Sequence, residues 1–308
     1  MFLTKCASHP LFFLIGLYTV TGFHHNHIPH HSTPGQNRIT PKELRRLSEE
    51  LFEKLPRGTL QMLNIDYQGR RESKDAKDEA PEPLLMVPRT FFKKLPTIQL
   101  LQKLYDNYDM NSLHAESVTE QEILEEDEFI DAILNTSVMM HTMDFLARKG
   151  YFRKDLNEYK ATLKRIWFTQ YSRTNHTSHQ GSSGFEHVFL VEKKRGNHIT
   201  GLHNWIFFAT EEYHNKADYL GYISKEVLAD RAAVLKFYVS YLGKTKLTSM
   251  FIGTTPEFDI ALFTLCFYAR PNKNCKVLLG NTKVTIQSWV QYSNNEVLIG
   301  SSFPKIYN

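Results

Sequence analysis

No stretch after residue 22 of this 308-residue chain is long and apolar enough to span a bilayer, which takes about 20 apolar residues. The chain also lacks internal repeats, a His-Glu-x-x-His motif and a Cys-x-x-Cys motif, which argues against a repeat protein and against a zinc peptidase. Its net charge of +4 is small, so a phosphate-rich partner is compatible with the composition without being required. With 42% hydrophobic and 23% charged residues, the composition is that of a globular protein.

The N-terminus has the pattern of a secretory signal. Lys5 precedes the apolar run Leu11–Val20, which is too short to span a bilayer. We therefore predict a signal peptide over residues 1–22, followed by a disordered His-rich tail over residues 23–38. The histidines of His24–His31 could bind metal, but no spacing among them defines a coordination geometry. We expect a secreted, monomeric protein without a membrane anchor.

Cysteine is scarce, with three residues in the chain. Removing the signal peptide would remove Cys6 and leave Cys266 and Cys275, whose short separation across a Pro-Asn turn predicts one disulfide in an oxidising compartment. The alternative is a pair of free buried thiols. Sequons for N-glycosylation at Asn135 and Asn175 agree with secretion.

Helical signals dominate the first half of the chain. Thr40 and Thr119 each begin a capping box, and the helix after Thr119 is expected to bury Leu124, Ile130 and Leu134. The charged stretch Arg70–Pro83 predicts an exposed loop. Helices are predicted over residues 41–54, 97–108, 120–135, 138–149 and 155–169.

Strand signals dominate the second half. Short β-rich runs predict strands near residues 218–223, 235–242 and 249–253, and successive strands between residues 275 and 304 separated by Gly-Asn and Asn-Asn turns. One helix interrupts them, with Thr255 as N-cap and Pro256 as its first residue. The pattern predicts an α+β fold with a helical N-terminal lobe, about residues 39–170, and a β-rich C-terminal lobe, about residues 171–308.

A hairpin is predicted between Phe185–Glu192 and His198–Phe208, because both stretches favour strands and a short basic turn joins them. When the last residue of the first strand pairs with the first residue of the second, His187 lies directly opposite His203. Opposed residues share a face, with Cβ atoms about 4.5–5.5 Å apart. A slip of one residue would separate the imidazoles, and packing without catalysis is the alternative explanation of the pair.

Two neighbouring histidines can provide a general base and a general acid near neutral pH. Cleavage of RNA by attack of the ribose 2′-OH on the adjacent phosphate needs such a pair, and Lys244 or Lys246 could stabilise the charge on the phosphorane. Glu186 and Glu192 would share a face of an extended strand but lie about 20 Å apart, at about 3.3 Å per residue, which is too far for one metal ion. They are therefore assigned separate functions.

Several ordered motifs together resemble the EndoU family of uridylate-specific endoribonucleases, over about residue 39 to the C-terminus. The motifs are SSGFEHVFLVE, TGLHNW, DYLGYI, SMFIGTTPEFDIALFTLCF and the closing GSSFP. The resemblance implies two α+β lobes around a cleft and cleavage of single-stranded RNA at uridines, giving 2′,3′-cyclic phosphate ends. It also implies dependence on Mn²⁺ or Ca²⁺.

The resemblance assigns roles residue by residue. His187 and His203 match the two catalytic histidines, Glu186 and Glu192 match acidic positions important for activity or metal dependence, and Ser249 matches the serine that contacts the uracil edge. On this basis Glu186 and Glu192 are the candidate metal ligands.

Two positions depart from the family pattern. Thr245, a candidate substrate-binding residue, stands where the family has its catalytic lysine. It is flanked by Lys244 and Lys246, of which Lys246 is the preferred replacement. Phe303 stands where the family has a tyrosine, and its ring can still stack on a base, worth about 1–3 kcal/mol. A catalytically weakened member that binds RNA or another polyanion is therefore the alternative to an enzyme, and a secreted scaffold that does neither is a third possibility.

Overall fold

The fold is described from a computed structural model that describes residues 38–74, 76–93, 95–173 and 180–306. The predicted signal peptide, nearly all of the His-rich tail and the Asn175 sequon lie outside these residues. Within the described part, Asn135 is exposed at the junction between two helices. No helix in that part combines the length and the apolar character needed to cross a membrane.

The predicted helices of the first half are confirmed, with their caps. At both Thr40 and Thr119 the threonine side chain accepts a hydrogen bond from the backbone N–H three residues on, and the glutamate side chain there accepts one from the threonine backbone N–H. The elements are α1 (Pro41–Phe52), α2 (Thr59–Met62), α3 (Arg89–Phe92), α4 (Pro96–Lys103), the short 3₁₀ helix η1 (Leu104–Asp106), α5 (Glu120–Leu134), α6 (Ser137–Arg148) and α7 (Leu156–Phe168).

Three details of that half differ from the prediction. The helix expected to reach residue 108 ends as α4 at Lys103 and tightens into η1. Leu124, expected in the core, is 58% exposed, whereas Ile130 and Leu134 are buried. The prediction of an exposed loop over Arg70–Pro83 is partly wrong, because Arg71 and Ala80 are buried and the backbone N–H of Arg71 donates to the carbonyl of Tyr222.

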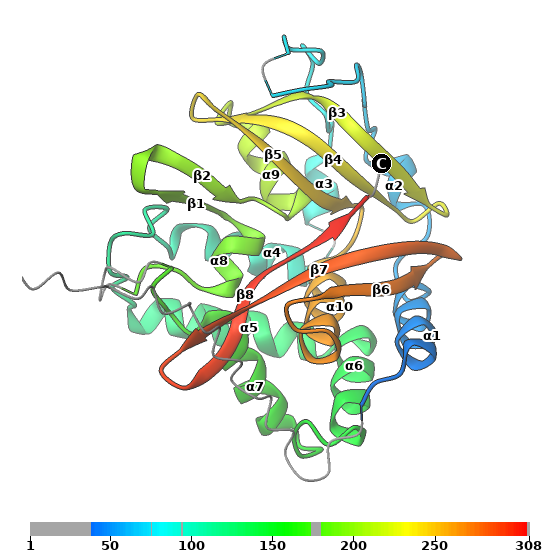
Figure 1. The fold of residues 1–308 in the computed structure, drawn as a ribbon, viewed down its shortest axis with the longest axis vertical. Coiled ribbons are helices and arrows are strands. Elements are labelled where there is room, and N and C mark those ends of the chain that lie inside the picture. The colour runs from blue at the N-terminus through cyan, green and yellow to red at the C-terminus, as the bar shows by residue number, and fades with distance from the viewer. Residues whose placement is uncertain (1–37, 75, 94, 174–179, 307–308) are drawn as a thin grey trace, which may run out of the picture. The chain divides into compact units, whose positions relative to one another are not determined.

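Among the described residues, the strands of the second half form three antiparallel sheets (Figure 1). Their order is β1-β2, β3-β4-β5 and β6-β7-β8, so sequence neighbours pair throughout. The bounds are β1 (Val191–Lys194), β2 (His198–Gly201), β3 (Ala217–Leu228), β4 (Ala232–Tyr241), β5 (Lys244–Ile252), β6 (Asn274–Leu279), β7 (Thr282–Ser293) and β8 (Glu296–Lys305). The α+β class is thus confirmed.

Helix α10 (Pro256–Ala269) connects the two halves of the chain. It is buried along nearly its whole length and contacts both β7 and the N-terminal helices α1 and α6 (Figure 1). Apolar residues lie on all sides of this helix, as expected of a helix enclosed by other elements, and Glu257 and Asp259 in its first turn are buried as well. Because helices from before residue 170 and strands from after it share one core, the lobe boundary at that residue stays a prediction.

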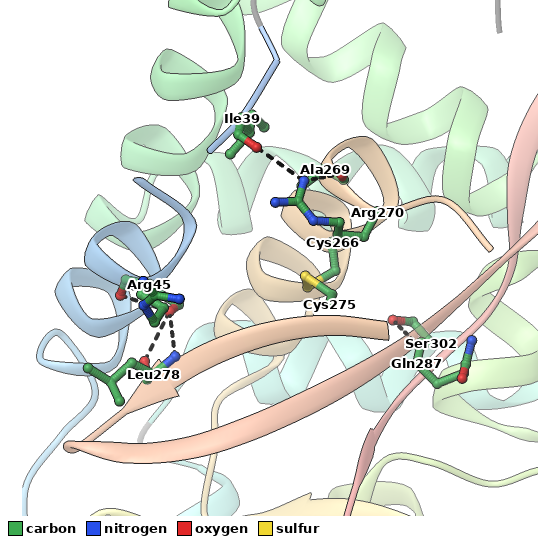
Figure 2. The surroundings of a disulfide bond; sticks show 10 residues. Ile39, Arg45, Cys266, Ala269, Arg270, Cys275, Leu278, Gln287 and Ser302 are labelled. Carbon is green, nitrogen blue, oxygen red and sulfur yellow. Dashed lines mark hydrogen bonds between the residues drawn. A yellow bond between two sulfur atoms is a disulfide. The ribbon is translucent and has the colours of Figure 1, made fainter. Parts of the chain in front are cut away.

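The predicted disulfide is confirmed. Cys266 in the last part of α10 and Cys275 at the start of β6 are bonded, with Cα atoms 5.6 Å apart (Figure 2). Nearby, the Nη1 of Arg270 donates to the carbonyl of Ile39 at 3.1 Å. The bond and this contact hold the turn after α10 against the sheet and against the start of the described chain.

Replacing both Cys266 and Cys275 with alanine should lower the free energy of unfolding. The two residues are 9 positions apart, and closing a loop of that size in the unfolded chain is worth about 2–3 kcal/mol. Urea unfolding of the variant against the oxidised wild-type protein measures the difference. An unchanged unfolding midpoint would contradict a stabilising role for the bond.

The predicted hairpin around the two histidines is largely wrong. Its paired part is short, and Lys194 rather than Glu192 lies opposite His198. The flanking segments are the helices α8 (Gly184–Phe189) and α9 (Trp205–Tyr213). Capping explains the difference, because each helix is preceded by a residue whose side chain accepts hydrogen bonds from its first turn, Ser183 for α8 and Asn204 for α9. These caps and complete burial outweigh the β propensity of the aromatic and branched residues.

Candidate active site

His187 and His203 lie side by side, as the sequence predicted, but they are not paired across a hairpin. His187 lies in α8 and His203 lies between β2 and α9. Their ring centroids are 5.8 Å apart, the ring planes are inclined by 47°, and both residues are less than 9% exposed. Two imidazoles at this distance can act on the same substrate group.

Each imidazole is oriented through its Nδ1 atom. The Nδ1 of His203 lies 3.0 Å from the backbone oxygen of Ser249, which can only accept, so Nδ1 carries the hydrogen. The Nδ1 of His187 lies 2.6 Å from Oε2 of Glu192, a carboxylate that favours the same tautomer. In both neutral rings the Nε2 atom therefore has a free lone pair, which a general base requires.

Glu192 is an almost fully buried carboxylate near the start of β1. Its Oε1 accepts from Nε of Arg173 at 2.9 Å and from the hydroxyl of Ser182, and its Oε2 also accepts from Thr200 at 3.3 Å. Burial acts to raise the pKa of Glu192, but His187 and Arg173 beside it hold that pKa well below its usual range. The group is therefore a carboxylate at neutral pH.

Both histidines are neutral in the free protein near pH 7. Burial is the main cause that lowers the pKa of His187, and the charge of Arg173 is the second. Burial also lowers the pKa of His203, followed by the charges of Lys246 and His187. The Glu192 carboxylate opposes the change at His187, so an added proton is held more readily there than on His203.

Lys246 is the lysine that the fold places at this site. Its Nζ donates to the backbone oxygen of Gly201 at 2.5 Å, two residues before His203. Burial lowers the pKa of Lys246 to about 7, and its charge acts on both histidines. Lys244 is exposed at the start of β5, and Thr245 points to the opposite face of the strand from Lys246.

His203 is contacted by Ser249 of β5 and by Phe303 of β8. The Oγ of Ser249 donates to the backbone oxygen of Pro304 at 2.6 Å, while its own carbonyl orients His203. The ring of Phe303 stacks on His203, with centroids 4.5 Å apart and planes inclined by 15°. One face of the phenylalanine ring is thus occupied by the imidazole and supports its orientation.

Replacing Phe303 with alanine should lower kcat/KM of an acid–base reaction at this site by about 3- to 10-fold, because an aromatic pair contributes about 0.5–1.5 kcal/mol beyond its buried area. Phe303→Tyr keeps the stacked ring and should retain the activity. Both variants are compared on one substrate under the same conditions. Equal losses in the two variants would show that the missing ring is not the cause.

Glu186 lies in α8 next to His187 but in a different environment from Glu192. Its Oε1 accepts from Nε2 of Gln170 at 2.8 Å, and burial raises its pKa to about 8. The estimate of about 20 Å between the two glutamates assumed an extended chain, and the helix shortens that separation.

The two glutamates do not form a common metal site. Both oxygens of Glu192 already accept hydrogen bonds from protein groups, and within the described ranges no group of three or more His, Cys, Asp and Glu side chains could hold a metal ion. The geometry gives Glu192 an orienting role toward His187 instead.

Several residues of the site were missed by the sequence reasoning. Arg173, Ser182 and Gln170 hold the two glutamates, and Thr248 donates to the carbonyl of Leu202 at 2.6 Å beside His203. Ser182 is the first residue of the SSGFEHVFLVE motif, but nothing in the local sequence of Arg173 marks it as part of a site.

A buried pair of histidines with a lysine beside it is typical of enzymes that use acid–base catalysis. Residues 43–304 match the family model described as Endoribonuclease XendoU, and the chain belongs to that family.

The relatives support the assignment. The chain is 32% identical to the uridylate-specific endoribonuclease EndoU of Drosophila melanogaster, over 97% of this chain and 94% of that protein. It is 34% identical to uridylate-specific endoribonuclease C of Danio rerio, over 89% and 91% of the two chains. The solved structure of XendoU, described as a splicing-independent snoRNA processing endoribonuclease, matches with a TM-score of 0.69 and 32% identity. That match covers 88% of this chain and 99% of XendoU.

Proposed function

We propose that this protein is a secreted, uridylate-specific endoribonuclease that cleaves single-stranded RNA by attack of the 2′-OH and leaves 2′,3′-cyclic phosphate ends. The observation that carries the proposal is the convergence of His187, His203 and Lys246 on one site in a chain of this family. Secretion is supported by the N-terminal apolar run and by the disulfide between Cys266 and Cys275.

The different partners of the two imidazoles suggest their roles. His203, whose Nδ1–H donates to a backbone carbonyl, is the general base. Its Nε2 removes the proton of the 2′-OH as that oxygen bonds to phosphorus. His187 is the general acid in the imidazolium form, which it takes up when the anionic RNA phosphate binds, because that phosphate and the Glu192 carboxylate stabilise the charge. Its Nε2 proton passes to the 5′-oxygen as the bond from phosphorus to that oxygen breaks.

Lys246 is suited to stabilise the transition state. An ammonium group in a largely buried position interacts strongly with charge that develops on the phosphorane oxygens. Ser249 is proposed to contact the uracil edge. Its hydroxyl hydrogen is engaged by Pro304 in this structure, so its oxygen would accept or the hydrogen would turn when a base binds.

Stimulation by Mn²⁺ or Ca²⁺ is proposed from the family resemblance alone. A divalent cation could neutralise RNA phosphates or the acidic side chains around α8. Glu186 is a buried carboxyl that carries no ion pair with Arg173 like that of Glu192, so it is better suited than Glu192 to respond to such a cation.

The test uses purified protein and a fluorogenic oligonucleotide with one uridine. Its matched control carries 2′-deoxyuridine at that position. Reactions contain EDTA, Mn²⁺ or Ca²⁺, and the ends of the products are identified by mass spectrometry. Cleavage only of the ribose-containing substrate, with a cyclic phosphate on the 5′ product, supports the proposal. Binding of RNA without cleavage under all three conditions would instead support a weakened, RNA-binding family member, and the absence of both would support a scaffold.

A further inference from the structure

Lys236 lies in β4, the middle strand of its sheet, directly opposite Ser249 of β5. Residues that pair in an antiparallel sheet point to the same face, with Cβ atoms about 4.5–5.5 Å apart. The Lys236 side chain therefore shares a face with the Ser249 hydroxyl, whereas Lys246 lies on the opposite face. Ser224 of β3 pairs with Lys236 on its other side, so the three residues form one polar row across the sheet.

The ammonium group of Lys236 has no carboxylate partner. The side chain is half-buried, yet within the described ranges its Nζ forms neither an ion pair nor a hydrogen bond. Glu226 and Asp218 are exposed residues of β3 on the same face. They pair with Val234 and Ser240, and so lie on either side of the polar row without an ion pair to it. A partly desolvated cation without an acidic partner is suited to bind an anionic ligand.

The next row on this face offers apolar surface. Tyr238 and Leu247 lie directly opposite each other, each two residues along its strand from the pair of Lys236 and Ser249. Leu247 is 43% exposed, and Tyr238 is half-buried. The guanidinium of Arg71 lies over the Tyr238 ring, with Cζ 5.2 Å from the ring centroid, and donates to backbone carbonyls of its own loop. The tyrosine ring is thus supported from one side.

We infer that Lys236 and Tyr238 bind a nucleotide that flanks the uridine, with the ammonium on a phosphate outside the cleaved linkage and the ring against a base. The inference rests on the proposed function, in which Ser249 contacts the uracil edge of the same RNA. Proteins that bind single-stranded RNA combine cations along the backbone with aromatic rings that stack on the bases. This face offers both in two successive rows of the sheet, the first of which contains Ser249.

The decisive measurement is the binding of a non-cleavable oligonucleotide, with 2′-deoxyuridine at its single uridine position, at several salt concentrations. Each phosphate contact to a single strand contributes about 0.7 to the slope of log Kd against log salt concentration. Lys236→Met should lower that slope by about this amount, whereas Lys236→Arg keeps the charge and the slope. A merely structural role would weaken binding without changing the slope, so an unchanged slope in folded Lys236→Met would overturn the inference.

Tyr238 is tested in the same binding assay. Tyr238→Leu removes the ring and should weaken binding about 5-fold or more, the loss of one stacked base, whereas Tyr238→Phe should bind like the wild type. Lys225→Met is the matched control, because Lys225 is an exposed lysine of the same sheet that pairs with Leu235 and lies on the other face. Equal effects of Lys225→Met and Lys236→Met would show a general effect of charge and overturn the inference.

Cleavage of RNAs of different length locates the contact. A dinucleotide with uridine on its 5′ side contains only the cleaved phosphate, so Lys236→Met should leave its kcat/KM unchanged. RNA extended on the side that reaches Lys236 should lose about 10-fold, the loss of one bond to a charged group. Equal losses on the dinucleotide and on longer RNA would place Lys236 at the reacting phosphate and overturn the inference.

Failure of the proposed function is distinguishable from failure of this inference. A wild-type protein that binds the oligonucleotide but cleaves no RNA would refute the proposed function, and the salt dependence of binding would still decide the role of Lys236. Cleavage by the wild type with unchanged binding by Lys236→Met and Tyr238→Leu would refute the inference alone. A wild-type protein that neither binds nor cleaves would refute both.

Discussion

Replacing His203 with alanine is expected to lower kcat/KM for uridine-containing RNA by about 10²- to 10⁴-fold, the usual contribution of a general acid or base. The expectation follows from three observations on His203. Its Nε2 is free, its ring centroid lies 5.8 Å from that of His187, and the Ser249 carbonyl orients the ring. His187→Ala should cause a loss of similar size. Single-turnover cleavage of an oligonucleotide with one uridine measures both.

The combined loss should be far from additive, because an acid and a base that serve one transition state depend on each other. His198→Ala provides the control, since His198 is exposed at the start of β2 and outside the pair. A variant with both histidines replaced that retains substantial cleavage would contradict the two-histidine mechanism.

Lys246→Met is expected to reduce kcat by about 10²- to 10³-fold, comparable to the loss of one preorganised donor to a developing oxyanion. Lys246→Arg keeps a positive charge and should retain part of the activity. Because burial lowers the pKa of Lys246 to about 7, the wild type loses this charge as the pH rises through that value, whereas arginine remains protonated. The ratio of Lys246→Arg to wild-type activity should therefore increase from pH 6 to pH 8.

Lys244→Met is the matched control, because Lys244 is two residues away on the same strand but exposed. It is expected to change kcat by much less than Lys246→Met. Equal effects of the two methionine variants would indicate a general contribution of positive charge to RNA binding, and a ratio independent of pH would contradict the lowered pKa of Lys246.

Local signals predicted much of the fold because their physical causes are local. Thr40 and Thr119 cap helices through hydrogen bonds to residues three positions on, and the turns at Gly280 and Asn294 occur where a positive φ is needed. The disulfide could be predicted because few cysteines leave few pairings.

The conformation around the histidines could not be predicted in the same way. Aromatic and branched residues make up most of Phe185–Phe189 and Trp205–Phe208. Such residues favour strands in a sheet that has one face buried and the other exposed to water. In this protein both segments are buried on all sides, so buried and exposed residues do not alternate as they would in a half-buried strand. The caps at Ser183 and Asn204 favour helices instead.

By itself, the sequence determined the α+β class, most helix starts, the disulfide and the residues His187 and His203 as a pair, since these depend on short-range chemistry and on ordered motifs. Only the tertiary structure decided that Lys246 rather than Lys244 lies at the site, that Glu192 binds His187, and that Arg173 holds Glu192. These three contacts join segments whose relative positions depend on packing across the whole core. Local sequence carries no record of that packing, because a buried polar group is satisfied by whichever partner the fold brings to it.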